Sequence, residues 1–294
     1  MTAKIIDGKK IAEEIRHEAK QEVQELLGRD IQPCLAVVLV GDNPASKAYV
    51  GSKVRTCEEV GIKSVKIELD ASVPEQDVLD VVDKLNRDVS VHGILVQFPL
   101  PHHMDEERVV ERIDPNKDVD GLHPENVGKL SIGIDCLSPC TPSGIPELIT
   151  RSGIEISGKH AVVIGRSQLV GKPMMNILVQ KGDKANCTVT CCHSGTDHLA
   201  NHTRQADILI AAIGVPEFVT AGMVKEGATV IDVGINRVED LEHSRGYRLV
   251  GDVDFDDVKE VAGAITPVPG GVGPMTVAML MKNTVKAARF IHHV

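Results

Sequence analysis

The sequence lacks any apolar run of the roughly 20 residues that a membrane-spanning helix requires. Its start, Met1 to Asp7, also lacks the apolar core of a secretion signal. Positive charge is scarce as well, because the formal net charge is -10 and the pI is near 5.6. No basic stripe could neutralise a row of phosphates. These absences argue against a membrane or a nucleic acid as a partner, and they predict a cytoplasmic protein.

Cysteine pairs with metal-ligand spacing are absent. The seven cysteines occur singly or inside strand-like runs, with neither a Cys-x-x-Cys pair nor a histidine at zinc spacing. We interpret them as buried thiols of a reducing compartment, and we predict no metal site. The remaining composition is that of an ordinary globular protein, with 42% hydrophobic and 25% charged residues. A chain of 294 residues is more consistent with two lobes than with one.

Segments typical of strands and helices alternate along the chain. Apolar residues at helical spacing predict a first helix that ends at Leu27, just before Gly28. We expect further helices over residues 44–60, 74–85, 105–113, 143–150 and 275–291, and strands over 35–40, 65–69, 93–97, 160–165, 187–192, 207–211 and 229–233. Repeated cycles of about 30 residues predict an α/β fold with parallel strands.

The same alternation predicts two domains. An N-terminal α/β catalytic domain is expected over residues 1–141, and the last helix is long enough to return to it, so that residues 275–294 complete it. Residues 142–274 have the strand and helix order of a Rossmann-like dinucleotide-binding domain.

The most unusual segment lies between these two parts, in Thr266-Pro-Val-Pro-Gly-Gly-Val-Gly-Pro-Met-Thr276. From Pro267 to Pro274 it contains three prolines and three glycines, which argues against helix or central strand there. An amphipathic helix follows directly. We interpret the segment as a shaped loop at a helix N-terminus, where a cofactor or substrate could approach bare backbone; a plain turn is the alternative.

A second glycine-containing segment, Gly165-Arg-Ser-Gln-Leu-Val-Gly171, follows an apolar strand and opens a helix. This context favours a nucleotide loop over an ordinary turn, although Ser167 stands where Gly-x-Gly-x-x-Gly has its middle glycine. The next strand ends at Cys192-His-Ser-Gly-Thr, without the carboxylate that usually holds the ribose of NAD. With Arg166 nearby, the sequence favours NADP over NAD.

Polar residues of the first lobe form a third group. Tyr49 and Lys53 are four residues apart on one helix, so their side chains share a face. Gln97 ends a buried strand, and Asp118 and Asp120 lie in the loop Lys117-Asp-Val-Asp-Gly121. Each has a structural alternative: a surface lysine over a tyrosine, an amide that caps backbone groups, and a simple turn.

Taken together, these segments resemble one family. The matching motifs are Tyr49-x-x-x-Lys53, Gln97-Phe-Pro-Leu-Pro101, Lys117 to Gly121, Pro139-Cys-Thr-Pro-Ser-Gly144, Gly165 to Pro173, Asp232-Val-Gly-Ile-Asn236, Gly251-Asp-Val-Asp254 and Thr266 to Thr276. In this order, over residues 4–291, the chain is similar to bifunctional methylenetetrahydrofolate dehydrogenases/methenyltetrahydrofolate cyclohydrolases. The resemblance implies NADP-dependent oxidation of 5,10-methylenetetrahydrofolate, followed by hydrolysis to 10-formyltetrahydrofolate.

The resemblance also implies roles for the residues of the first lobe. Lys53 would polarise or protonate the folate and, when neutral, would activate water for attack on the methenyl carbon. Gln97 would hold Lys53 by a hydrogen bond, and Tyr49 would stack on the folate. Asp120 would accept hydrogen bonds from the pterin ring.

The other lobe would bind the cofactor. The family pattern assigns cofactor-binding roles to Gly165, Arg166, Ser167, Ser194 and Ile235, with Ile235 at the nicotinamide end. Backbone at Pro269, Gly270 and Gly273 would approach the folate. Gly195 stands where the family often has Arg or Lys, so a site that accepts both NADP and NAD is an alternative.

Two further readings stay open, a dehydrogenase that has lost the cyclohydrolase activity and a folate- or nucleotide-binding regulator without turnover. The family also implies a homodimer.

Overall fold

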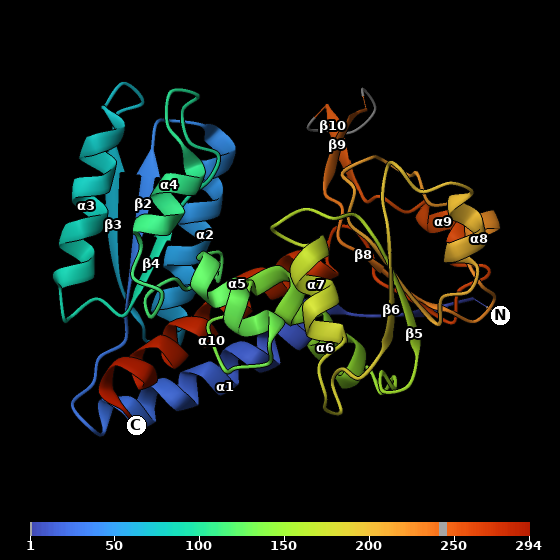
Figure 1. The fold of residues 1–294 in the computed structure, drawn as a ribbon, viewed down its shortest axis with the longest axis horizontal. Helices are drawn as coiled ribbons and strands as arrows, with labels where there is room; N and C mark the ends of the chain where they lie inside the picture. Colours follow the sequence, from blue (N-terminus) through green and yellow to red (C-terminus); the bar gives the residue numbers. More distant parts are fainter. Residues whose placement is uncertain (1, 241–245) are drawn as a thin grey trace. The chain divides into compact units, whose positions relative to one another are not determined.

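The computed structural model describes residues 2–240 and 246–294. The chain forms two compact units. Unit 1 comprises the residues up to Ala12 and Thr141–Thr276, and unit 2 comprises Glu13–Cys140 and Val277–Val294. Each unit is built on a parallel sheet with helices beside it (Figure 1). The predicted α/β fold, with a C-terminal helix that returns to the first lobe, is confirmed.

The N-terminal segment belongs to a different unit from the one we predicted. Strand β1 (Lys4–Ile5) pairs in parallel with β11 (Ala264–Ile265) at the edge of the sheet of unit 1. This pairing places the residues up to Ala12 in unit 1, whereas the expected first domain began at residue 1. A two-residue strand has no periodic pattern, so the sequence alone did not indicate it.

Unit 2 is organised around a three-stranded parallel sheet of order β3-β2-β4. Its strands are β2 (Cys34–Val40), β3 (Lys63–Leu69) and β4 (Gly93–Val96). Its helices are α1 (Gly8–Leu27) and α10 (Val272–His292), which both begin in unit 1, and α2 (Pro44–Val60), α3 (Glu75–Arg87), α4 (Glu106–Arg112) and α5 (Pro124–Ser131).

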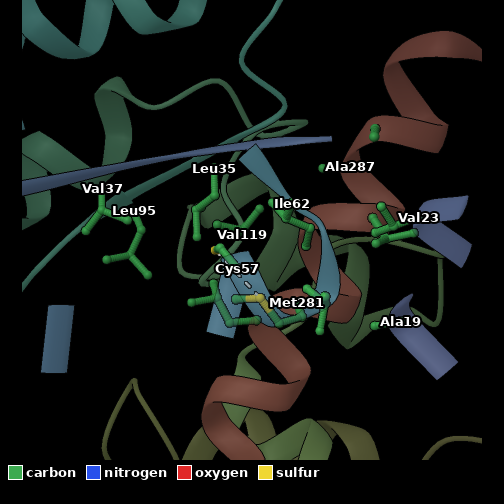
Figure 2. Packing of buried hydrophobic residues seen from close by; sticks show 14 of the residues in the cluster. Ala19, Val23, Leu35, Val37, Cys57, Ile62, Leu95, Val119, Met281 and Ala287 are labelled. Carbon is green, nitrogen blue, oxygen red and sulfur yellow. Dashed lines mark hydrogen bonds between the residues drawn. The ribbon is translucent and has the colours of Figure 1, made fainter. Parts of the chain in front are cut away.

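The central strand β2 is buried on both faces. Successive side chains of a strand point to opposite faces, so β2 contributes to two cores. Leu35 and Val37 lie in one core with Cys57 of α2 and Met281 of α10 (Figure 2). Ala36 lies in the other core, which contains apolar residues of α3 and α4. Packing on both faces fixes β2, and with it the strand β4 and the helix α2 that carry the predicted site.

The C-terminal helix α10 lies beside α1 in unit 2. Lys282 of α10 forms an ion pair with Glu22, and Arg289 donates to Glu25 at 3.0 Å. These two helices have 20 and 21 residues. Even so, no helix in the described part of the chain is both long and apolar enough to cross a membrane.

Unit 1 contains a six-stranded parallel sheet of order β1-β11-β8-β7-β5-β6. Its other strands are β5 (His160–Ile164), β6 (Thr188–Cys192), β7 (Ile208–Ala211) and β8 (Thr229–Asp232), and β9 (Asn236–Glu239) pairs with β10 (Tyr247–Val250) in a separate antiparallel sheet. Its helices are α6 (Cys140–Arg151), α7 (Gly171–Leu178), α8 (Leu199–Thr203), α9 (Phe255–Val258) and the 3₁₀ helix η1 (Ala221–Met223). Since β5 has β6 on one side and β7 on the other, the strand order reverses there. Open α/β sheets bind ligands beside such a reversal, at the carboxyl ends of the strands.

A buried histidine joins the start of β4 to the end of α10. The Nδ1 atom of His92 accepts a hydrogen bond from the amide of Cys34 at 3.2 Å, so the neutral ring carries its proton on Nε2. Nε2 lies 3.0 Å from Nε2 of His292. Burial, and next the charge of His292, lower the pKa of His92 to about 4, while Asp88 opposes this shift.

We therefore predict an acid-dependent loss of stability at His92. The folded state keeps this ring neutral down to about pH 4, whereas the unfolded chain binds a proton below its ordinary pKa of 6.5. The contribution is thus complete above pH 6.5 and is lost as the pH falls toward 4, by on the order of 3 kcal/mol. Urea unfolding at several pH values should give a flatter profile for His92→Asn than for wild type. The exposed His17→Asn serves as control, and parallel wild-type and His92→Asn profiles would contradict the prediction.

Candidate active site

Lys53 is a buried cation on α2. Asn43 caps this helix, because its side chain accepts from the amides of Ala45 at 2.9 Å and Ser46 at 3.2 Å, and Pro44 occupies its first turn. The Lys53 residue is only 9% exposed, which is rare for lysine. A helix anchored at its start therefore presents an ammonium group inside unit 2.

Gln97 is the partner of this ammonium group. Nζ of Lys53 donates to Oε1 of Gln97 at 3.0 Å. The backbone amide of Gln97 continues the strand pairing by donating to Val38, and Nε2 donates to the carbonyl of Phe98 at 2.7 Å. Since Nε2 is occupied there, Oε1 is the atom that faces the lysine. This bond uses one of the three ammonium donors, and within residues 2–240 and 246–294 the other two have no acceptor, so they are available to water or a ligand.

Tyr49 lies one helical turn before Lys53 on α2. The residue is 51% exposed and is one of the exposed large hydrophobic residues of the described chain. The structure thus places an accessible aromatic ring next to the buried lysine, as the spacing of the two residues predicts.

Two residues of the loop after α4, Lys117 and Asp118, form hydrogen bonds that hold this loop in place. Nζ of Lys117 donates to three carbonyls at the end of α3, those of Leu85, Asn86 and Asp88, at 2.8 to 3.0 Å. The carboxylate of Asp118 accepts from the amide of His123 and from the side chain of Asn126. Burial lowers the pKa of Lys117 and raises that of Asp118. Both side chains thus form hydrogen bonds that hold the loop in place.

Asp120, in the same loop, differs from Asp118 in its hydrogen bonding. Burial raises the pKa of its carboxyl, and the Lys53 ammonium opposes this rise, so the two groups interact. Among the described residues, none donates a hydrogen bond to the Asp120 carboxylate. The next residue, Gly121, has a φ of 69°, and a Cβ there would lie 2.4 Å from the carbonyl carbon of Ser138. Tight backbone packing thus holds a carboxylate without a protein donor near Lys53.

The loop after β5 in unit 1 carries Arg166 and Ser167. A Cβ on Gly165 would lie 2.2 Å from the Ala212 carbonyl oxygen, and one on Gly171 would lie 2.3 Å from that of Gly165, so both positions require glycine. The Ser167 hydroxyl accepts from the amides of Val170 and Gly171 at the start of α7, which leaves its proton free to be donated. Arg166 is exposed.

The loop after β6 brings Ser194 to the same edge. Ile164 of β5 lies opposite Cys192 of β6, so Arg166 and Ser194 each lie two residues beyond a paired position. His193 shapes this turn by accepting from the amide of Gly195 at 3.1 Å, and Ser194 is exposed. An arginine and two hydroxyls at this edge, with no carboxylate at the end of β6, are the donor set that a 2′-phosphate requires.

The glycine- and proline-rich segment is partly helical, which corrects our prediction. Helix α10 begins at Val272, so Gly273 and Pro274 lie in its first turn, where a missing proline amide is tolerated. A Cβ on Gly273 would lie 3.4 Å from Cδ1 of Ile235, a residue that is 49% exposed. Gly270 has a φ of 113°, a conformation that favours glycine. Pro269 and Gly270 precede the helix in this segment.

Two buried carboxylates at this edge had no predicted role in cofactor binding. Asp252 is fully buried and Asp232 is 3% exposed. Their signal in the sequence is a nearby glycine: a Cβ on Gly234 would lie 2.2 Å from Asp252 Oδ1, and one on Gly251 would lie 1.7 Å from Asp232 Oδ2. A glycine beside an aspartate after an apolar strand could therefore have indicated a buried carboxylate.

These features define a class of protein, an enzyme with a dinucleotide-binding α/β unit and a second α/β unit that carries a buried lysine bonded to a glutamine. The chain belongs to the tetrahydrofolate dehydrogenase/cyclohydrolase family. The model of the family's catalytic domain matches residues 6–120, and that of its NAD(P)-binding domain matches residues 139–292.

The relatives cover nearly the whole chain. The bifunctional protein FolD of Chlorobium luteolum is 59% identical over 285 residues, which are 95% of this chain and 96% of that protein. A crystal structure of the bifunctional FolD enzyme from Campylobacter jejuni has a TM-score of 0.92 at 47% identity and covers 98% of this chain and 99% of its own. The Trypanosoma brucei enzyme, complexed with NADP cofactor and inhibitor, has a TM-score of 0.92 at 39% identity, with both chains fully covered. The predicted family and enzyme class are confirmed.

The contacts of Lys117 predict a purely structural role. Replacing it with methionine leaves three carbonyls at the end of α3 without their donor, so Lys117→Met should lower the free energy of unfolding by about 2–4 kcal/mol. Urea unfolding would measure this loss. Lys129→Met is the matched control, because among the described residues Lys129 forms an ion pair with Glu125 alone, on the same helix, and such pairs contribute about 0.3–0.5 kcal/mol. Equal losses in the two variants would refute the assignment.

Proposed function

We propose that this protein oxidises 5,10-methylenetetrahydrofolate with NADP as hydride acceptor and then hydrolyses the methenyl product to 10-formyltetrahydrofolate. Family membership supports both reactions. The observation that carries the proposal is the buried ammonium of Lys53, which donates to Oε1 of Gln97 at 3.0 Å. Residues 13–140 and 277–294 would form the folate-binding domain, and the residues up to Ala12 together with 141–276 would form the NADP-binding domain.

Lys53 is proposed as the proton-transfer group of the hydrolysis. When neutral, its amine takes a proton from the water that attacks the methenyl carbon. As the carbon–N5 bond of the adduct then breaks, N5 receives a proton from the lysine, the hydroxyl group of the adduct loses its proton to solvent, and the resulting formyl group stays on N10. One water is consumed and one proton is released, because the methenyl substrate is a cation and the product is not. No electrons are transferred, and the lysine returns to its starting state. During the oxidation, the same group polarises the folate.

Gln97, Asp120 and Tyr49 are proposed to orient the reactants. Gln97 fixes Nζ of Lys53 through an oxygen whose direction is set by the bond from Nε2 to Phe98. Asp120 offers two carboxylate oxygens to the paired N–H donors of the pterin ring. Tyr49 provides an exposed ring on which a flat ligand can stack. Holding both partners in place lowers the barrier because fewer degrees of freedom are lost in the reaction.

NADP, when bound, supplies the hydride acceptor. The loops after β5 and β6 in unit 1 fit it, because Arg166 is cationic, Ser167 and Ser194 carry hydroxyl groups, and β6 ends at Cys192 without a carboxylate. We propose that Gly165 allows close approach, that Arg166, Ser167 and Ser194 hold the 2′-phosphate, and that Ile235 lies at the nicotinamide end.

Other parts of the proposal rest on the resemblance alone. These are the approach of Pro269, Gly270 and Gly273 to the folate, the homodimer and the supply of one-carbon units for purine synthesis. We also propose a cytoplasmic location, which the lack of a membrane-spanning apolar run in the sequence favours.

Lys53→Met provides the first test. The variant should lose cyclohydrolase activity by about 10²–10⁴-fold, the usual contribution of a general base. The assay follows the decay of supplied methenyltetrahydrofolate and, separately, NADPH formation from methylenetetrahydrofolate. Lys47→Met is the control, because Lys47 is an exposed lysine on the same helix. Wild-type hydrolysis by Lys53→Met would refute the role of Lys53, and a wild type without either activity would refute the proposed function.

Arg166→Gln tests the choice of cofactor. Loss of a cation from the 2′-phosphate should raise the Kd for NADP by about 10–100-fold and leave that for NAD within about threefold, because NAD has no 2′-phosphate. Isothermal titration calorimetry with both cofactors gives the two constants, and the exposed Lys181→Gln controls for net charge. Equal weakening of both cofactors would mean that Arg166 does not read the 2′-phosphate.

A further inference from the structure

Asp252 lies at the centre of a network that joins three loops of unit 1. Its Oδ2 accepts from the amides of Ile213 at 2.7 Å and Gly214 at 3.0 Å, in the loop after β7. Its Oδ1 accepts from Nδ2 of Asn236 at 2.9 Å, at the start of β9. The side chain is fully buried, so these bonds replace all contact with water.

Asp232, the last residue of β8, extends the network. Its Oδ1 accepts from the amides of Gly234 and Asp252, each at 2.9 Å, and its Oδ2 accepts from that of Val253 at 3.0 Å. Its own amide donates to Thr266 Oγ1 at 2.8 Å, just beyond β11. The two carboxylates therefore connect the carboxyl ends of β7 and β8 with the segment from Asp252 to Val253, and the backbone amide of Asp232 adds a link to the end of β11.

All donors in this network are neutral amides. In the described chain, neither Asp232 nor Asp252 forms an ion pair with a lysine or arginine. Burying a carboxylate without a cation destabilises the fold unless its oxygens accept hydrogen bonds. Stability alone therefore does not explain why this unit contains two such carboxylates. Each carboxylate instead accepts several hydrogen bonds and so fixes the conformation of the short loops after β7 and β8. Removal of one carboxylate would leave several amides without acceptors.

The network holds the segment that carries Ile235 from both sides. Gly234 donates to Asp232 on one side of Ile235, and Asn236 donates to Asp252 on the other. Ile235 is not one of the donors to these carboxylates, and the residue is half-exposed at the edge of the sheet. The hydrogen bonds of Gly234 and Asn236 thus fix the backbone on both sides of Ile235.

We propose that Asp232 and Asp252 are positioning residues for the dehydrogenase reaction, because they fix residues 213–214 and 233–236 and so hold Ile235 in place at the nicotinamide end of the cofactor. This inference rests on the proposed function. It assigns to the two carboxylates no contact with the cofactor, only control of the loops that would make that contact.

Asp252→Ala and Asp252→Asn separate geometry from charge. Asparagine keeps an oxygen that can accept from Ile213 and Gly214, and Asn236 can rotate its amide to accept from the new Nδ2. We expect Asp252→Ala to lower kcat/KM for NADP by about 10²-fold, the scale of an error near 1 Å in placement, and to raise the Kd for NADP measured by calorimetry. Asp252→Asn should restore both to within about fivefold of wild type, a difference near 1 kcal/mol. Cyclohydrolase activity should change less than about threefold in either variant.

Asp254→Ala is the matched control. Asp254 lies in the same segment, but its side chain caps α9 by accepting from the amide of Asp257 at 3.2 Å. This variant should lose stability and keep the wild-type Kd and KM for NADP. If Asp252→Ala does not fold, Asn236→Ala is used instead, because it removes only the hydrogen bond from Asn236 Nδ2 to Asp252 Oδ1. We expect this variant to raise the Kd for NADP by about 3–10-fold.

The outcomes are distinct. A folded Asp252→Ala protein with a lower melting temperature but wild-type Kd and KM for NADP would overturn the positioning role, and so would equal loss of both activities. For Asn236→Ala, an unchanged Kd would also overturn it. A wild type with neither activity would overturn the proposed function instead, while the Kd values for NADP would still test the inference.

Discussion

Parallel strands end at one edge of a sheet, and the loops that leave that edge must satisfy their backbone groups without a neighbouring ladder. Both units place their polar side chains at such an edge. In unit 2, Gln97 follows β4 and the helix of Lys53 follows β2. In unit 1, the loops after β5, β6 and β8 carry Arg166, Ser194 and Ile235. The chemistry of the protein depends on this directional property of parallel sheets.

The cost of burial separates structural from functional polar groups. Lys117 and Lys53 are both buried in unit 2, yet Lys117 donates to three carbonyls and Lys53 donates to one amide oxygen. The first ammonium has no spare donor, and the second has two. A carboxylate pair shows the same contrast, because Asp118 accepts from an amide and a side chain whereas Asp120 has no donor among the described residues. Unused hydrogen-bonding capacity inside a folded unit is thus the reason why we propose Lys53 and Asp120 as groups that bind a ligand.

Long periodic elements were predictable. Helix α2 runs from Pro44 to Val60 as the sequence indicates, since an asparagine cap and a proline start it and Gly61 ends it. Short elements were not: β1 and β11 have two residues each, and α9 has four, too few for a period to show. The start of α10 was wrong by three residues because Pro274 was taken as a helix breaker, although a helix tolerates proline in its first turn.

By itself, the sequence determined which residue types recur at which spacing: the shared face of Tyr49 and Lys53, the loop from Gly165 to Gly171, and the absence of a carboxylate after β6. The tertiary structure alone decided that Lys53 meets Gln97, 44 residues away, and that Asp232 and Asp252 share one network. The reason is range. Helical and strand periods depend on neighbours along the chain, whereas contacts between distant residues follow from strand order and register, which only packing of the whole unit selects.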